Sequence, residues 1–191
     1  APIEEREPLL VLLAFNHQIA SIPDSVSENT LGEMRLQWWR DTIKAIFDGK
    51  IREHPVVLGL AWTIKKYDLS QSLFEEYLEG RRFDVRKAPP ETMNELETYI
   101  KNTVGALNEL MAEVLLVKVK QQTRLAARYA GVVWGLSALL ENAHLFTSKG
   151  RFYLPVNLTE NERVKVVVNT AEEYLVKVRG FKEYVPDSLL P

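Results

Sequence analysis

Helix-start signals recur along the chain, and their pattern limits the fold more than any other feature. Three segments have the form Thr-x-x-Glu, in which each side chain can accept a hydrogen bond from the backbone N–H of the other residue. They begin at Thr30, Thr92 and Thr159. Apolar residues between them recur at helical spacing, and no stretch shows the alternation of a strand. We therefore expect an all-α fold of roughly six to eight helices. The expected helices cover residues 30–49, 54–67, 70–83, 92–119, 122–146 and 159–179.

Composition and charge narrow the class of protein. A chain of 191 residues can bury a sizeable core, so we expect one helical domain over residues 1–191, truncated at one or both ends. The absence of cysteine excludes thiol nucleophiles and zinc–thiolate sites, and it suits a bacterial cytoplasm or a mitochondrial matrix equally. The net charge of −2 argues against a nucleic-acid partner. The apolar run at residues 9–15 is shorter than the roughly 20 residues that span a bilayer, so only peripheral membrane contact is expected.

The distribution of acidic residues excludes one kind of metal site. Of the 26 acids, 20 are Glu and six are Asp, and no two Asp lie within four residues of each other. The chain therefore has no DDxxD or DxxxD motif, the arrangement that gathers carboxylate oxygens around magnesium ions. We expect no metal site and no cofactor.

Four segments, in order along the chain, carry a resemblance to a known family. They read LAFNH (13–17), GEMRLQWWR (32–40), EGRRFD (79–84) and GRFYLP (150–155). Together they resemble the squalene/phytoene synthases. The second segment is most similar to a branch that includes bacterial phytoene-synthase-like proteins and an assembly factor of mitochondrial complex I. The resemblance implies the class I terpenoid synthase fold, in which helices enclose a central cavity.

Active members of this family join two prenyl diphosphates head to head. Two Asp-rich helical motifs face each other across the cavity and hold the magnesium ions that bind diphosphate. Carboxylates and magnesium are needed because the diphosphate leaving group carries a high negative charge.

Neither Asp-rich motif is complete in this chain. At the first motif only Asp24 remains, because the acids before it are replaced by alanine and serine. At the second motif, Asn142 replaces the first Asp, and Leu145 and Phe146 replace the Glu-Asp pair. One lone carboxylate cannot hold a cluster of magnesium ions. We therefore expect a retained fold that has lost the ionisation chemistry.

Some residues at the family's cavity positions are expected to be vestigial. They are His17, Asp24, Asp84, Asn142 and Arg151. Asp84 follows Arg81 and Arg82, so a structural ion pair is the favoured interpretation. His17 replaces a family arginine, and a plain surface histidine is favoured there. Arg151 belongs to a basic turn, which fits a helix end as well as a site for an anionic headgroup.

A tryptophan pair suggests a partner surface. Trp38 and Trp39 cannot both face the core from one helix, so we expect one to be buried and the other partly exposed. Exposed tryptophan suits a binding surface. The candidate partner surface consists of Arg35, Trp38 and Arg40. An ordinary solvated helix face is the simpler alternative.

These observations favour a non-catalytic member that acts by protein or lipid binding, and the resemblance implies a role in respiratory complex I assembly. One alternative is an active prenyltransferase that condenses farnesyl or geranylgeranyl diphosphate head to head, and magnesium is expected only in that case. The other is an isoprenoid-binding module. It predicts an open apolar cavity lined by residues 129–140, a helix that is apolar on nearly every side and is expected to be central.

Overall fold

The computed structural model describes residues 3–86, 88–116 and 119–185. Within these ranges every regular element is helical, which confirms the expected all-α class. The α-helices are α1 (Ile3–Ala20), α2 (Asn29–Phe47), α3 (Pro55–Tyr67), α4 (Gln71–Gly80), α5 (Arg82–Arg86), α6 (Met93–Ile100), α7 (Ala106–Leu115), α8 (Gln121–Glu141), α9 (Ala143–Ser148) and α10 (Glu160–Gly180). The short turns are η1 (Ile22–Asp24), η2 (Lys101–Gly105) and η3 (Lys182–Tyr184).

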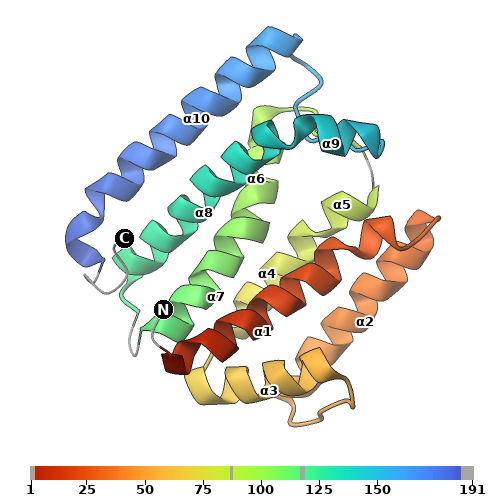
Figure 1. Cartoon of the computed structure of the whole chain (residues 1–191), viewed down its shortest axis with the longest axis vertical. Coiled ribbons are helices and arrows are strands. Elements are labelled where there is room, and N and C mark those ends of the chain that lie inside the picture. The colour runs from red at the N-terminus through yellow and green to blue at the C-terminus, as the bar shows by residue number, and fades with distance from the viewer. Residues whose placement is uncertain (1–2, 87, 117–118, 186–191) are drawn as a thin grey trace.

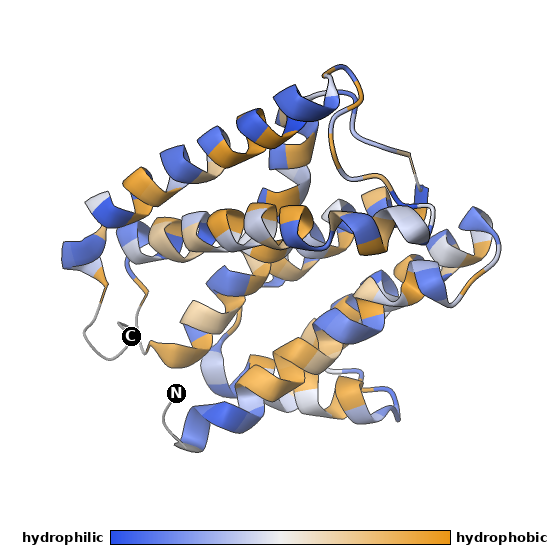
Figure 2. Cartoon of the chain, turned by 45° about the horizontal axis from the view of Figure 1, so that its top comes forward, coloured by the Kyte–Doolittle hydropathy of each residue, from blue (hydrophilic) through white to orange (hydrophobic). Residues whose placement is uncertain are grey.

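The helices pack around two apolar clusters (Figure 1). α1, α2, α3, α4 and α7 enclose the first, in which Phe15, Phe74 and Tyr77 are fully buried. α6, α8 and α10 enclose the second, around Leu96 and Val132. α7 joins the two groups, since it packs on α1 and α4 as well as on α8. Figure 2 shows apolar residues interleaved with polar ones along the helices, as amphipathic helices require.

The helix starts agree only in part with the capping signals. The capping box expected at Thr159 is confirmed at the start of α10. At Thr92 only the threonine half of the box forms. The box expected at Thr30 is wrong, and α2 begins one residue earlier. There the Glu33 carboxylate instead accepts a hydrogen bond from Arg82 of α5, with Nε and Oε2 3.2 Å apart. A tertiary ion pair has therefore replaced the local cap.

The longer expected helices are broken. The one expected at residues 92–119 contains η2, a π turn that holds one extra residue, and it ends at Leu115. The one expected at 122–146 ends at Glu141 and resumes as α9. The helix expected at 70–83 is split into α4 and α5.

α8 is central, because it packs on α6, α7, α10 and η2. The expectation that the helix over residues 129–140 is central is confirmed, although Trp134 on its outer side is 66% exposed. Within the described residues, no helix combines the length and the apolar character needed to cross a bilayer.

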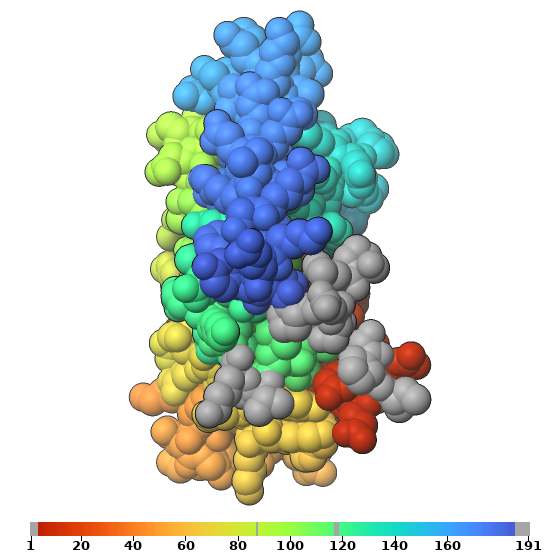
Figure 3. All heavy atoms as spheres, turned by 90° about the vertical axis from the view of Figure 1, so that its left-hand side faces the viewer, coloured from red at the N-terminus to blue at the C-terminus, as the bar shows by residue number. Residues whose placement is uncertain are grey.

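α10 lies along the outside of the molecule (Figure 3) and is tied to α6 by a polar contact. The Tyr174 hydroxyl of α10 donates to the Glu97 carboxylate of α6, which also accepts from Lys101 Nζ at 2.6 Å. Burial acts to raise the pKa of the Glu97 carboxyl. Hydrogen bonds from Lys101 and Tyr174 outweigh burial and hold that pKa below its usual value.

Glu97→Gln is expected to remove part of the acid sensitivity of folding. A carboxyl whose pKa is lowered in the folded state stabilises the protein above its unfolded pKa. That contribution is lost as the pH falls through the folded pKa. The wild type should therefore exceed the variant in free energy of unfolding at pH 7, and the difference should shrink as the pH falls through the unfolded and then the folded pKa of Glu97. Urea denaturation across this range measures it, and a difference that does not change with pH would contradict the assignment.

Candidate functional site

The first Asp-rich position meets the basic turn after α9 in an ion pair. Asp24 ends η1 and is exposed, whereas Arg151 is 8% exposed. The Arg151 guanidinium donates to Asp24 Oδ1, and Lys149 Nζ lies 3.4 Å from Asp24 Oδ2. The one surviving carboxylate of the first motif is therefore compensated by two cations of the same chain.

The second-motif positions offer little to a cation. Asn142 Nδ2 donates to the Ala138 carbonyl at 2.8 Å. Leu145 is 45% exposed, and the Phe146 ring packs edge-on against Tyr153 with centroids 5.0 Å apart. Magnesium takes several oxygen ligands in octahedral array. These residues do not fit a magnesium–diphosphate cluster, and the described parts of the chain contain no group of three or more metal-ligating side chains suitably placed.

Asp84 lies at the centre of a buried hydrogen-bond network and is itself 5% exposed. Its Oδ2 accepts from Arg81 Nη1 at 2.9 Å. Its Oδ1 accepts from the hydroxyls of Tyr99 and Tyr153, each at 2.8 Å. The structural ion pair expected for Asp84 is confirmed, with Arg81 as the partner.

Arg81 extends this network to α1. Its Nη2 donates to Asn16 Oδ1 at 2.9 Å, and its Nε donates to the Tyr77 hydroxyl at 3.0 Å. The Tyr77 hydroxyl donates in turn to the same Asn16 oxygen at 2.7 Å. The network therefore connects α1, α4, α5, α6 and the segment after α9.

Burial fixes the protonation of these groups. It raises the pKa of the Tyr77, Tyr99 and Tyr153 hydroxyls, and the charge of Asp84 raises these pKa values further. Burial would lower the pKa of Arg81, but the tyrosines and Asp84 outweigh it and raise that pKa well above its usual value. The three tyrosines stay protonated and Arg81 stays charged near neutral pH. The arrangement can clamp helices together, but these groups are not poised to exchange protons with a substrate.

His17 is exposed on α1, and its carbonyl accepts from the Ser21 N–H at 3.0 Å. No described side chain pairs with its imidazole. This placement agrees with a plain surface histidine.

The candidate partner surface is split between two sides of α2. Trp39 is 5% exposed and Trp38 is 36% exposed, which confirms that only one of the pair is buried. Arg40 lies two residues, or roughly 200°, further around the helix from Trp38. It donates to the Glu79 carboxylate of α4 at 2.7 Å, while Arg35 donates to the serine hydroxyl just after η1. The three residues therefore do not form one patch, and a partner role for Trp38 stays a prediction.

Ion pairs on the inner side of α8 were not expected from the sequence. Arg128 binds Glu76 of α4 and Glu109 of α7, the latter with Nε and Oε1 2.7 Å apart. Arg124 binds Glu113 of α7. The available signal was the pair of arginines four residues apart in a largely apolar helix, because such a pair lies on one face. These contacts hold α8 against α4 and α7.

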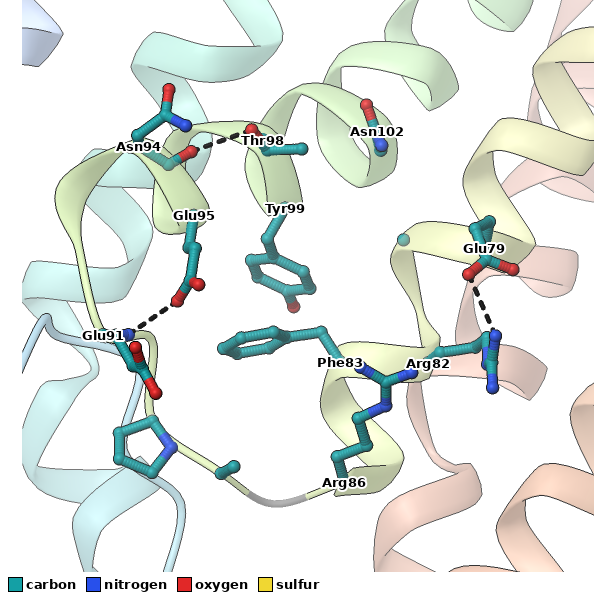
Figure 4. A pocket seen from close by; sticks show the side chains of 13 residues that line it. Glu79, Arg82, Phe83, Arg86, Glu91, Asn94, Glu95, Thr98, Tyr99 and Asn102 are labelled. Atoms are coloured by element: carbon teal, nitrogen blue, oxygen red, sulfur yellow. Dashed lines mark hydrogen bonds and ion pairs between the residues drawn. The ribbon is translucent and has the colours of Figure 1, made fainter.

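Two of the pockets among the described residues adjoin these contacts. One, of about 720 Å³, lies between α9, the segment after it and the start of α10, and Phe146, Phe152 and Arg163 line it. It reaches the 129–140 segment at Leu139. The other, of about 490 Å³, lies between α5 and α6 (Figure 4). The cavity expected along residues 129–140 meets the first pocket only at Leu139, and no sequence pattern indicated the second.

The fold defines a class of protein, the class I terpenoid synthase scaffold, and in this chain the Asp24 carboxylate is held in an ion pair with Arg151. The chain matches the squalene/phytoene synthase family over residues 1–184 and belongs to that family. Among solved structures it is similar to squalene synthase HpnC from Alicyclobacillus acidocaldarius, with a TM-score of 0.84 at 17% identity, over 99% of this chain and 77% of that one. This likeness confirms the fold.

Two curated relatives show the range of the family. The chain is 30% identical to NADH dehydrogenase (ubiquinone) complex I, assembly factor 6 from Bos taurus, over all of this chain and 62% of the relative. It is 28% identical to the bifunctional protein CrtB/UppS from Streptomyces coelicolor, over 81% of this chain and 27% of that protein. The chain thus spans less than two thirds of the length of either relative.

Proposed function

We propose that this chain is a non-catalytic member of the squalene/phytoene synthase family that binds a protein partner and assists the assembly of respiratory complex I. The observation that carries the proposal is the ion pair of Asp24 with Arg151 and Lys149. In this ion pair the carboxylate that would bind magnesium and the cations that would bind diphosphate are bound to each other. The proposal includes no cofactor, and it places the protein in a mitochondrial matrix or a bacterial cytoplasm.

Electrostatics supports this proposal over the prenyltransferase alternative. A diphosphate leaving group needs several cations, and magnesium needs carboxylates on both sides of the cavity to hold it. Here the surviving carboxylate Asp24 faces an arginine, and Asp84 is enclosed by Arg81 and two tyrosines. The similarity to complex I assembly factor 6, over the whole chain, supports the assembly role.

A genetic complementation separates a binding role from a catalytic one. In cells that lack the protein, we expect assembled complex I to fall on native gels, and tagged full-length protein to co-purify with complex I subunits. Asp24→Asn should restore assembly as well as the wild type does, because the proposed role needs no metal ligand. Normal complex I in the deficient cells, or failure of a folded Asp24→Asn variant to restore it, would contradict the proposal.

The pocket beside α9 favours a second candidate, an isoprenoid- or lipid-binding module. Its walls include Phe146, Phe152 and Leu154, and Arg163 lies at its edge. Arg163 Nε is buried without a hydrogen-bond partner among the described residues. A fluorescent farnesyl probe should then bind the wild type and bind Phe152→Ser at least tenfold more weakly. Equal binding to both would exclude this pocket.

A further inference from the structure

The pocket of about 490 Å³ between α5 and α6 lies apart from the family's diphosphate positions, and we call it the α5–α6 groove (Figure 4). Its two main walls are formed by Arg82, Phe83 and Arg86 of α5, and by Asn94, Thr98 and Asn102 of α6 and η2. Glu79 of α4 and Glu91 lie toward its ends. Its volume suits a ligand of a few residues rather than a single ion.

An aromatic ring forms the apolar part of this groove. Phe83 packs against Tyr99 with centroids 4.9 Å apart and an angle of 34° between the rings. Phe83 itself is only partly buried. In Figure 4 its ring lies between the glutamates Glu91 and Glu95 on one side and the arginine side chains on the other. An apolar side chain of a ligand would therefore find a ring to pack on, with charged groups to either side.

The charges around the Phe83 ring favour a ligand group with a single negative charge over a polyphosphate. Arg82 is already bound to Glu33 and Glu79, at 3.2 and 3.1 Å. Arg86 has no ion-pair partner within the described residues, and Figure 4 shows its side chain reaching back toward Phe83. The groove lining holds two arginines against three glutamates, so it would repel a multiply charged anion. One free guanidinium suits a single carboxylate.

The opposite wall offers hydrogen bonds suited to a peptide backbone. Asn94, Thr98 and Asn102 recur every four residues, so they follow one face of the helix over about 12 Å. The side-chain amides of Asn94 and Asn102 make no hydrogen bond to any described residue. A primary amide both donates and accepts, which matches the N–H and C=O of a peptide group.

We propose that the α5–α6 groove binds an extended segment of a protein partner, with an apolar side chain against Phe83 and an acidic side chain against Arg86. Phe83 and Arg86 lie three residues apart on a helix, with their Cβ atoms about 5 to 6 Å apart. Alternate side chains on one face of an extended peptide are about 7 Å apart, so the acidic residue lies two positions from the apolar one. This inference rests on the proposed protein-binding function and identifies its docking site.

A randomised heptapeptide library, displayed on phage and selected on the immobilised full-length protein, tests this site. Enriched peptides should share an acidic residue two positions from a large apolar one. By fluorescence polarisation, a selected peptide should bind Arg86→Glu at least tenfold more weakly than the wild type, and Asn102→Ala about fivefold more weakly. Arg179→Glu, on the exposed side of α10, is the matched control and should bind within twofold of the wild type. Circular dichroism checks that each variant is folded.

A charge exchange makes the test specific. A selected peptide whose acidic residue is changed to lysine should lose affinity for the wild type and regain it for Arg86→Glu. Absence of enriched peptides, or equal binding to Arg86→Glu and Arg179→Glu, would overturn the groove as the docking site. If complex I subunits still co-purify in that case, the proposed function stands and only the location of its surface fails.

Discussion

Asp84→Asn is expected to lower the free energy of unfolding by about 3 to 5 kcal/mol. Asp84 is 5% exposed, and its two oxygens accept hydrogen bonds from Arg81, Tyr99 and Tyr153. The substitution preserves the shape of the side chain but removes the charge that compensates the buried Arg81 guanidinium. An uncompensated buried charge is among the most destabilising changes that a single substitution can cause.

Asp24→Asn is the matched control, because Asp24 is the other aspartate retained at a family position. Its side chain is 45% exposed, and its partners are Arg151 and Lys149. Arg151 is buried, but the Asp24 carboxylate is half-exposed and water screens its charge, so this variant should lose clearly less stability than Asp84→Asn. Urea denaturation of both variants at pH 7 measures the two losses. Equal losses would contradict the assignment of Asp84 as the structural aspartate.

Gly131→Ala is expected to lower the free energy of unfolding by about 2 kcal/mol or more. A Cβ atom at Gly131 would lie 2.8 Å from the carbonyl oxygen of Val104 and 3.0 Å from the Cα of Gly105. Both are backbone atoms of η2, so rotating a side chain cannot relieve the contact. α8 and η2 would have to move apart, and the second apolar cluster would loosen with them.

Gly180→Ala controls for the general effect of adding a methyl group to a helix. A Cβ atom at Gly180, the last residue of α10, would have no heavy atom within 4 Å. Alanine is the better helix former by up to about 1 kcal/mol, so this variant should match or exceed the wild type. Thermal unfolding should show Gly131→Ala several degrees below Gly180→Ala. Matching midpoints would mean that α8 and η2 are not in close contact.

The fold was predictable to the extent that helix signals are local. Pro55, which suits the first position of a helix, placed the helix at residues 54–67 close to α3, and the box at Thr159 placed the start of α10. The capping signal failed at Thr30, where a residue distant in the sequence binds the side chain that would have capped the helix. At the start of α2, Glu33 binds Arg82 from α5 instead of capping its own helix. Nothing within residues 30–33 reveals that competitor.

The candidate site was likewise predictable only where its features depend on local sequence. The absence of acids at Asn142, Leu145 and Phe146 could be predicted from the sequence, because it depends only on which residue type stands at each family position. The ion pair of Asp84 with Arg81 was also predictable, since the residues are three apart on a short helix. The hydroxyl of Tyr153, which is 69 residues away from Asp84 in the sequence, was not. The α5–α6 groove depends on how two helices meet, and no sequence pattern marks it.

Magnesium-dependent diphosphate binding tests the central claim, that the scaffold is retained without its chemistry. The full-length protein is titrated with farnesyl and geranylgeranyl diphosphate, with magnesium and with a chelator, and released inorganic diphosphate is measured in parallel. We predict the same binding isotherm with and without magnesium, no release of diphosphate, and no change in Asp24→Asn. Magnesium-dependent binding or turnover that is lost in Asp24→Asn would contradict the account.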